Sequence, residues 1–584
     1  MSEHKPETQE EYSFYNLFVP LTTKKAIFII IVVGCIVYFN MLFNGFVWDD
    51  KTYLIGKPDV HTLNIFQLIG NNIFNIGGYY RPLTAIYFAI LYAIFNASSF
   101  YYHFFQLVLH IACGVLLFFL FKKFFKLPIS LLLSLIFVIH PIQVESVSYI
   151  SSSDSPLIFI FGISALLFST QKSNSIRKTV LIFLLLLLSV LTKEAGILFL
   201  FFVLLYRFIF IRKNILAYFI GAIATVLIYL VIRFEIGKVF FAKPLLDPIA
   251  RLPFKERLIN IPAIVTYYLK TFFYPAHLAI DQFWIIKNIT LTSFYLPLFI
   301  IIVFFFALFL LGYKLFKSNK KTFSIFLFFV NWYIVGMLLY VQFTPLDMTV
   351  ADRWFYVPIV GLLGILGIIL EYLVKHGEKT KKICYTFAVI IIVMLSIRTI
   401  VRNSNWIDAK TLYTHDSQVL DNFDIENSLG SEYNAENNYK EALIYFKKSV
   451  ALDPYEVNLF NVGSQYEKLG NIHAAENYYA MAITKPHYLL IPQKHLTYTY
   501  ERYGYVLLFT NNFQKANMIA NVGLKEYPND VNLWIVLALS KYKLHNQEQA
   551  LDAAIKAKTL LSVQQTNYIY NQILNKNPIQ IPQE

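Results

Sequence analysis

Long uninterrupted apolar runs constrain this 584-residue chain more than any other feature of its sequence. A helix needs about 20 apolar residues to cross the hydrocarbon core of a bilayer, and such runs recur throughout residues 1–402. They predict an all-α, polytopic membrane domain with about eleven transmembrane helices. The expected spans are 26–46, 103–121, 128–146, 155–170, 179–193, 195–211, 215–233, 292–313, 322–343, 355–374 and 383–401.

The composition excludes other classes of protein. Hydrophobic residues make up 57% of the chain and charged residues 15%, against roughly 45–50% and 25% in soluble domains. A soluble enzyme could not bury this much apolar surface, and disordered chains are poor in aromatic and branched residues. The three cysteines, Cys35, Cys113 and Cys384, all lie inside apolar runs, so neither a disulfide framework nor a Cys-based zinc site is expected.

Charge is divided unevenly along the chain. Residues 403–584 contain 15 Lys and Arg and 18 Asp and Glu, whereas residues 1–402 contain 35 and 18. The net charge of +14 therefore belongs to the membrane part. A nucleic-acid-binding protein carries its basic face on a soluble module, and here that module is mildly acidic, so nucleic acid is not an expected partner.

Basic residues predict the orientation, because cytoplasmic loops are enriched in Lys and Arg. With eleven spans, all six basic clusters fall on one side, which places the tail 1–25 in the cytoplasm and residues 403–584 outside. The composition hints at an AT-rich genome, so a bacterial inner membrane is expected, or an endoplasmic-reticulum membrane in a eukaryote. The clusters are Lys24–Lys25, Lys122–Lys126, Lys172–Lys178, Arg212–Lys213, Lys314–Lys321 and Lys375–Lys382.

Twelve of the 18 acidic residues in residues 1–402 map to the opposite, outer face or just inside it, while four lie in the N-terminal tail and Glu371 and Glu378 flank a cytoplasmic basic cluster. Charge at membrane depth is costly and is usually functional, so an acidic outer crevice is the expected place for chemistry. Two long outer loops, 47–102 and 234–291, border it, and within the first loop 61–74 and 82–95 are expected to lie along the interface. The acids are Asp49, Asp50, Asp59, Glu145, Asp154, Glu194, Glu235, Asp247, Glu256, Asp281, Asp347 and Asp352.

Residues 403–584 contain a repeated pair of amphipathic helices. A small residue is followed by an alanine 12 positions later in four units, which are offset by 33, 41 and 34 residues, and a proline closes each of the first three. This pattern predicts a tetratricopeptide-repeat α-solenoid, whose concave surface typically binds peptide or protein. A helical cap without a partner is the alternative. The longer step predicts an insertion near Tyr488–Leu496.

Two adjacent carboxylates, Asp49 and Asp50, follow the first span within the sequence Trp48-Asp49-Asp50. Their mutual repulsion at a membrane boundary raises at least one pKa. A carboxylate there is able to accept the proton of an attacking hydroxyl. Taken alone, the pair is equally typical of a helix cap or a solvated loop.

Four further motifs share this predicted face. Arg81 offers a fork that suits phosphate oxygens, and the others add a histidine, a lysine, carboxylates and a second arginine. Each also has a purely structural interpretation, such as a helix end, a tight loop or a local ion pair. The motifs are Tyr79-Tyr80-Arg81-Pro82-Leu83, His140-Pro141-Ile142-Gln143-Val144-Glu145, Thr192-Lys193-Glu194 and Asp352-Arg353-Trp354-Phe355-Tyr356.

The order of these motifs, followed by repeats, closely resembles the transmembrane and tetratricopeptide-repeat O-mannosyltransferases, which belong to the GT-C class of membrane glycosyltransferases and are related to the protein O-mannosyltransferases. The resemblance covers nearly the whole chain, with 26–402 as the catalytic domain. It implies inverting transfer of a hexose such as mannose from a polyprenyl-phosphate carrier to a protein hydroxyl.

The resemblance also implies roles for individual residues. Asp49 and Asp50 supply the catalytic base, with Asp49 the first choice, and Arg81 faces the donor phosphate. Lys193 and Arg353 are assigned to the same phosphate. The residues expected to shape the cleft are His140, Glu145, Glu194 and Asp352.

No metal or other cofactor is required by this mechanism, because a lipid phosphate is a reasonable leaving group and fixed cations stabilise its charge. A divalent cation held by Asp49 and Asp50 is the less favoured alternative. Two other functions stay open: a lipid-linked polysaccharide ligase or polymerase, and a non-enzymatic transporter or scaffold that docks partners through its repeats. The absence of paired span repeats and of mid-membrane acids argues against a transporter.

Overall fold

The computed structural model describes residues 20–70, 78–171, 175–240, 247–485 and 493–581. Within these ranges the secondary structure is helical, with turns between the helices and an isolated bridge from Gln282 to Val350. The all-α prediction is therefore confirmed. The chain divides into two compact units, the first reaching Leu412 and the second beginning at Tyr413.

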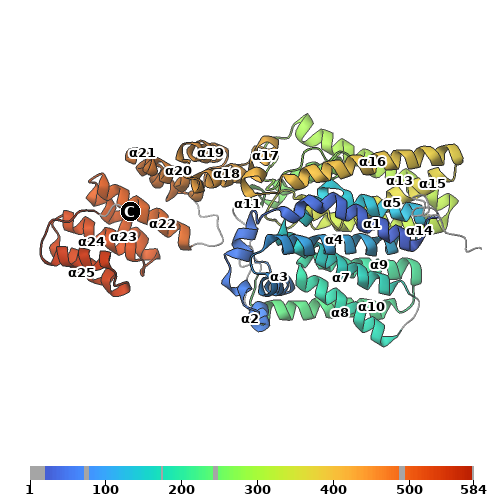
Figure 1. The fold of residues 1–584 in the computed structure, drawn as a ribbon, viewed down its shortest axis with the longest axis horizontal. Helices are drawn as coiled ribbons and strands as arrows, with labels where there is room; N and C mark the ends of the chain where they lie inside the picture. The colour runs from blue at the N-terminus through green and yellow to red at the C-terminus, as the bar shows by residue number, and fades with distance from the viewer. Residues whose placement is uncertain (1–19, 71–77, 172–174, 241–246, 486–492, 582–584) are drawn as a thin grey trace, which may run out of the picture. The chain divides into compact units, whose positions relative to one another are not determined.

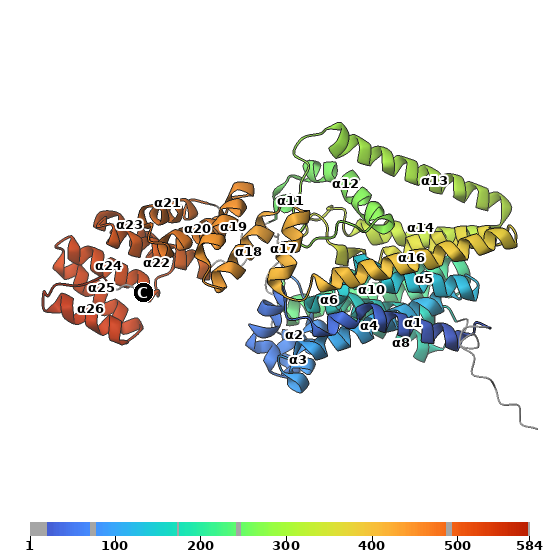
Figure 2. The same ribbon diagram turned by 45° about the horizontal axis from the view of Figure 1, so that its top comes forward.

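The first unit is a bundle of apolar helices (Figures 1 and 2). Helices α1, α4, α5, α7 and α9 lie side by side in it. Its helices are α1 (Thr23–Tyr38), α2 (Ile65–Gly70), α3 (Pro82–Phe95), α4 (Ser99–Phe121), α5 (Leu127–Ile139), α6 (Val144–Ser148), α7 (Asp154–Ser169), α8 (Ile176–Thr192), α9 (Ile197–Tyr206), α10 (Ile215–Val231), α11 (Pro248–Arg251), α12 (Phe254–Phe273), α13 (Leu296–Ser318), α14 (Lys320–Leu338), α15 (Ile359–Val374) and α16 (Glu378–Ser404).

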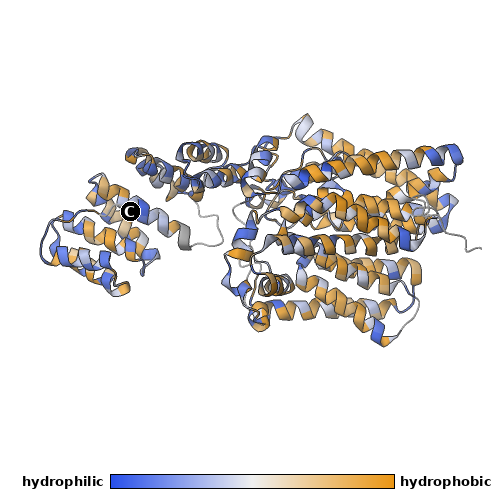
Figure 3. Ribbon diagram, in the orientation of Figure 1, coloured by the Kyte–Doolittle hydropathy of each residue, from blue (hydrophilic) through white to orange (hydrophobic). Residues whose placement is uncertain are grey.

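Each of the eleven predicted spans corresponds to a helix or helix pair, but they differ in length. Among the described residues, eight helices are long and apolar enough to cross a membrane, or nine if the bent pair of α5 with Pro141–Ser148 forms one span. The other two, α8 and α15, have 17 and 16 residues. These two shorter helices together with the nine make up the eleven predicted segments. Figure 3 shows that hydrophobic residues predominate along the bundle helices.

The third predicted span is broken at His140-Pro141, where the chain bends by 49°. Proline has no N–H and excludes helical backbone from the residue before it, and His140 is accordingly extended (φ −70°, ψ 127°). The carbonyls freed by the break have new donors. His110 on α4 contacts the carbonyl of Val138 at 2.9 Å, and Thr399 on α16 donates to that of Ile139 at 2.6 Å.

The first outer loop is folded against the end of the bundle. Helix α3 packs against α4 and α8 and is seen nearly end-on in Figure 1, across the direction of α4. Phe88 and Leu91 of α3 are buried with Leu54 and Leu68 in one apolar cluster. This crosswise course is the one expected of an interfacial helix. The predicted stretch 61–74 forms only the short α2, and its last four residues lie outside the described ranges.

The second unit consists of antiparallel helix pairs, with α18 packed on α19, α20 on α21, α22 on α23 and α24 on α25, followed by α26. This confirms the repeat prediction. The predicted insertion lies largely outside the described residues. The helices are α17 (Ala409–Val419), which spans the junction of the units, α18 (Phe423–Ala435), α19 (Tyr439–Leu452), α20 (Glu456–Lys468), α21 (Ile472–Ala482), α22 (Gln493–Phe509), α23 (Phe513–Glu526), α24 (Val531–Lys543), α25 (Gln547–Leu560) and α26 (Gln564–Leu574).

Small residues allow the two helices of each repeat to approach closely. A Cβ added at Gly430 would lie 2.7 Å from the ring of Phe446, and one at Gly463 would lie 2.8 Å from the ring of Tyr479. The alanine 12 positions after each is fully buried. Asparagines at Asn438, Asn471 and Asn512 accept hydrogen bonds from the first turns of the second helices, which is the preferred capping chemistry.

We predict that Gly361→Ala destabilises the membrane unit. A Cβ at Gly361 would lie 2.5 Å from the backbone nitrogen of Tyr333 and 2.8 Å from the carbonyl oxygen of Phe329, so α14 and α15 must separate. Overpacking of this kind costs about 1–3 kcal/mol. The control is Gly70→Ala, whose Cβ meets nothing within 4 Å. Equal thermal unfolding of both variants in detergent would contradict the prediction.

Candidate active site

The Trp48-Asp49-Asp50 motif forms a strained turn at the end of the first span. The turn is anchored to the end of α16, because the side chain of Asn44 donates to the carbonyl of Asn403 at 3.1 Å. Trp48 has φ +53°, a left-handed conformation that is uncommon for a bulky residue. Such strain persists where the surrounding contacts over-determine it, and it is concentrated at functional sites.

Asp50 is fully buried and holds this turn together. Its Oδ1 accepts hydrogen bonds from the backbone N–H and the hydroxyl of Ser151 at 2.7 and 2.6 Å, and its Oδ2 accepts one from the N–H of Val47 at 3.3 Å. Burial raises the pKa of Asp50 to about 7, although these bonds lower it. Near neutral pH Asp50 is therefore partly protonated, which reduces its repulsion of Asp49.

Asp49 is half-buried, whereas its neighbour Asp50 is buried. Its Oδ2 accepts a hydrogen bond from the hydroxyl of Tyr149 at 2.9 Å. Burial raises the pKa of Asp49, and the hydrogen bond from Tyr149 and the charge of Arg353 act in the opposite direction. The negative charge of Asp347 also raises the pKa of Asp49.

The indole of Trp48 contacts two residues that act on Asp49. The ring of Tyr149 stacks on it at 4.8 Å between centroids, and the guanidinium of Arg353 lies 5.2 Å from its centroid. Trp354 is likewise stacked on Tyr340, at 5.3 Å. The Trp48 ring thus helps to position Tyr149 and Arg353 beside Asp49.

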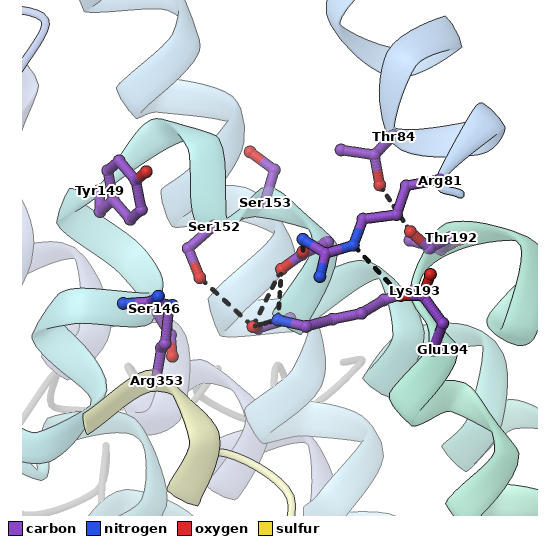
Figure 4. Close-up of polar contacts among 12 residues, drawn as sticks. Arg81, Thr84, Ser146, Tyr149, Ser152, Ser153, Thr192, Lys193, Glu194 and Arg353 are labelled. Carbon is purple, nitrogen blue, oxygen red and sulfur yellow. Dashed lines mark hydrogen bonds and ion pairs between the residues drawn. The ribbon is translucent and has the colours of Figure 1, made fainter. Parts of the chain in front are cut away.

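The predicted phosphate ligands Arg81 and Lys193 are brought together by a third residue, Asp154. Asp154 is the first residue of α7 and is buried. Its two carboxylate oxygens accept from Nη1 of Arg81 at 2.9 Å and from Nζ of Lys193 at 3.0 Å. Figure 4 shows both cations converging on this point from separate elements.

Glu194 forms a second layer behind Arg81. One of its oxygens accepts from Nε of Arg81 at 3.3 Å, and the other accepts from the backbone N–H of Tyr80 at 2.9 Å and from Nη1 of Arg233 at 3.0 Å. Burial lowers the pKa of Arg81, but the charges of Asp154 and Glu194 outweigh it, so its pKa lies above the ordinary value. Glu194 thus lies in the site, as predicted, and orients the loop that carries Arg81.

Arg353 reaches the site from the other side and is paired with Glu145. Its guanidinium donates to one oxygen of Glu145, and its backbone N–H donates to the other at 3.2 Å. The negative charge of Asp347 raises the pKa of Arg353, as it raises the pKa values of Arg81 and Asp49. The three predicted groups therefore share one electrostatic environment.

Two predicted residues are committed to other contacts. His140 is buried, and its Nδ1 accepts from the N–H of Ile142 at 3.2 Å while its Nε2 meets the carbonyl of Phe272 at 3.0 Å. Asp352 is buried and accepts from the hydroxyl of Tyr267 at 2.6 Å. Both orient the helix ends around the site. Among the described residues, no group of three or more His, Cys, Asp or Glu is arranged to hold a metal.

Sequence reasoning did not assign roles to Asp154, Tyr149, Arg233 and Asp347. The sequence placed Asp154 and Asp347 among the acids of the outer face, and it gave no further indication that they belong to the site. Tyr149 follows the His140–Glu145 motif within a polar stretch, Ser146–Ser155, that is otherwise unusual in an apolar domain. That stretch was the signal for Tyr149.

The fold and site define a polytopic all-α membrane protein with a tetratricopeptide-repeat solenoid and a charged cluster at one end of its bundle. The chain is similar to human Protein O-mannosyl-transferase TMTC3, with 25% identity over 514 residues, covering 78% of this chain and 55% of the relative. It is also similar to the Caenorhabditis elegans Protein O-mannosyl-transferase F38B6.6, with 27% identity over 455 residues, covering 73% and 62%. The resemblance predicted from the motifs is thus confirmed.

The chain spans little more than half the length of the curated relatives that it matches first. No family model matches it. Among solved structures it is similar to YrrB, described as a TPR protein with an unusual peptide-binding site, with 15% identity and a TM-score of 0.22, covering 33% of this chain and 88% of that one.

We predict that Asp154→Asn destabilises the membrane unit by about 3–5 kcal/mol, the usual cost of leaving buried charges unpaired. Arg81 and Lys193 would lose the carboxylate that joins them. The double variant Asp154→Asn with Lys193→Met removes one unpaired cation and should regain part of the loss. The measurement is the free energy of unfolding of Asp154→Asn, of Lys193→Met and of the double variant. A loss in the double variant equal to the sum of the losses in the two single variants would contradict this coupling.

Proposed function

We propose that this protein is a GT-C membrane glycosyltransferase that transfers a hexose, mannose in particular, from a polyprenyl-phosphate carrier to a protein hydroxyl. The observation that carries the proposal is the half-buried carboxylate of Asp49, held by Tyr149 beside a cluster of cations. The similarity to proteins named O-mannosyltransferases supports the sugar and the acceptor class.

In this mechanism Asp49 accepts the proton of the acceptor hydroxyl as its oxygen attacks C1 of the sugar. The bond between C1 and the phosphate oxygen breaks, and its electron pair stays on the leaving phosphate. Attack opposite the leaving group inverts the anomeric centre. Asp49 is suited to this role because Asp50 is occupied by three internal hydrogen bonds, whereas Asp49 is bound by Tyr149 at one oxygen.

Arg81 and Lys193 stabilise the leaving phosphate, and Arg353 supports them from the other side. In the ion pairs of this cluster, Arg81, Lys193 and Arg233 meet the carboxylates of Asp154 and Glu194. The phosphate of the donor is an anion that guanidinium and ammonium groups are suited to bind. Donors fixed before the reaction stabilise developing charge without reorganisation, and the reaction as written needs no metal.

The repeat unit is proposed to engage the protein acceptor. A cavity of about 1020 Å³ lies beside the extended segment that ends the described chain. Ile579 of that segment is buried against the repeats, and the carbonyl of Asn577 accepts from the hydroxyl of Tyr542 at 2.9 Å. A polypeptide in extended form thus already fits this surface, which supports a peptide as its ligand.

The proposed orientation places residues 1–25 in the cytoplasm and both the charged cluster and the repeats on the outer side. The basic clusters of residues 1–402 support it through the enrichment of Lys and Arg in cytoplasmic loops. The proposed domains are 26–402 for catalysis and 403–584 for acceptor binding.

We predict that Asp49→Asn lowers transfer by about 10²–10⁴-fold, the usual contribution of a general base, while membrane insertion and unfolding temperature are retained. The assay incubates purified protein with labelled polyprenyl-phosphate hexoses and acceptor peptides. The control is Asp59→Asn in the same loop, which should keep full activity. Full activity of Asp49→Asn would remove Asp49 from the mechanism, and donor consumption without peptide acceptors would favour a polysaccharide ligase.

We predict that Tyr149→Phe moves the acid limb of the pH–rate profile to higher pH. The hydroxyl of Tyr149 stabilises ionised Asp49, so its removal raises the pKa of the base and a higher pH is needed to ionise it. The expected shift is about 1 pH unit, because a hydrogen bond to a charged group contributes about 1.5 kcal/mol. The variant leaves unchanged the other groups whose charges interact with Asp49, which are Asp50, Arg353, Asp347 and Tyr53. Tyr92→Phe is the control, and an unshifted limb for Tyr149→Phe would contradict the assigned role.

A further inference from the structure

A cavity lined by both polar and apolar residues lies at the opposite end of α7 from the candidate active site. It has a volume of about 460 Å³ and is bordered by the last turns of α4 and α7. Helix α7 begins at Asp154 and ends at Ser169, so the two places are about 22 Å apart along the helix. The cavity is therefore separate from the proposed catalytic machinery. Its lining residues are Leu116, Phe119, Lys122, Lys123, Ser164, Leu167, Phe168 and Gln171.

The lining changes from polar to apolar along the helices. Lys122, Lys123 and Gln171 lie just beyond the ends of α4 and α7, while the apolar side chains lie within the last two turns. Phe119 and Phe168 are each 36% exposed, and both belong to helices that are able to span a membrane. This order matches a lipid that lies along the bundle with its headgroup at the helix ends.

The headgroup end of the cavity is positively charged. None of its lining residues is acidic, and the hydrogen bonds of its lysines in the described chain are to neutral groups. Lys122 donates to the hydroxyl of Thr23 at 2.7 Å, and the neighbouring Lys178 donates to the side-chain oxygen of Gln171 at 2.6 Å. Neither bond neutralises the charge, so an anion placed here meets several cations.

Helix C-termini normally repel anions because their last carbonyls point outward. Here those carbonyls have donors. On α7, the Leu167 carbonyl accepts from the hydroxyl of Thr170 at 2.8 Å, and the Ser169 carbonyl accepts from Nη1 of Arg207 at 3.3 Å. On α4, the backbone N–H groups that follow Phe121 bond to the carbonyls of the last turn. The carbonyls of these helix ends thus have donors, while the hydrogen bonds and ring contacts of Lys122 and Lys178 among the described residues are to neutral groups.

We propose that this cavity is a binding site for an anionic glycerophospholipid, with the phosphate at Lys122 and Lys123 and an acyl chain along Phe119 and Phe168. Clusters of Lys at membrane helix ends attract anionic headgroups, and the apolar rows are open to the bilayer. The site is independent of the transferase activity. We name it the α4–α7 lipid site.

The test measures lipid affinity of the full-length protein by native mass spectrometry, with phosphatidylglycerol and phosphatidylcholine as probes. We expect tighter binding of phosphatidylglycerol, and we expect Lys122→Gln with Lys123→Gln to weaken it by about 30-fold, which corresponds to about 1 kcal/mol per lysine. The charge-matched control is Lys126→Gln with Lys320→Gln, which removes two lysines outside the cavity and should leave the affinity unchanged.

A second variant tests the cavity itself without changing charge. Ser164→Phe fills the space between α4 and α7 and should also abolish the preference for phosphatidylglycerol. Equal binding of both lipids to the unaltered protein would overturn the proposal, as would equal losses in the test and control lysine variants or an unchanged preference in Ser164→Phe. Circular dichroism confirms that each variant is folded before the measurement.

Discussion

The carboxylate of Asp154 lies between two cations that come from distant parts of the chain, and the geometry of the polar end of the bundle depends on it. Arg81 is 73 residues away in sequence and Lys193 is 39 residues away. Without the carboxylate, two buried positive charges would face each other in surroundings of low dielectric constant. With it, the outer loop, the start of α7 and the junction of α8 with α9 are fixed to one point. Glu194 extends the same linkage to Arg233 and to the backbone of Tyr80.

Features that depend on local sequence pattern were predictable. Each apolar run that was predicted to span the membrane forms a helix or a helix pair in the structure. A segment that crosses lipid needs a continuous apolar stretch, so the sequence pattern alone locates it. The repeat spacing identified the helix pairs of the second unit, because close packing requires small residues at fixed positions, as at Gly430 and Gly463. Two of the predicted spans, α8 and α15, are short helices of 17 and 16 residues.

Features that depend on pairing between distant segments were not predictable. Asp154 appears in the sequence as one acid among many, and nothing near it indicates that it joins Arg81 to Lys193. Tyr149 shows no motif, yet its hydroxyl contacts Asp49 across 100 residues. The resemblance to a family assigned His140 to the cleft, and the sequence did not indicate that both of its ring nitrogens are used within the fold.

The break at His140-Pro141 fixes the register of the surrounding helices. Its freed carbonyls are held by His110 of α4 and Thr399 of α16, and the ring of His140 reaches the end of α12. If α16 slid by one turn along the bundle, a carbonyl would be left without a donor in a region that water does not reach, at a cost of several kcal/mol. Sliding of these helices is therefore an unfavourable route for admitting a substrate. Movement of the loops at the bundle end would leave these three bonds intact.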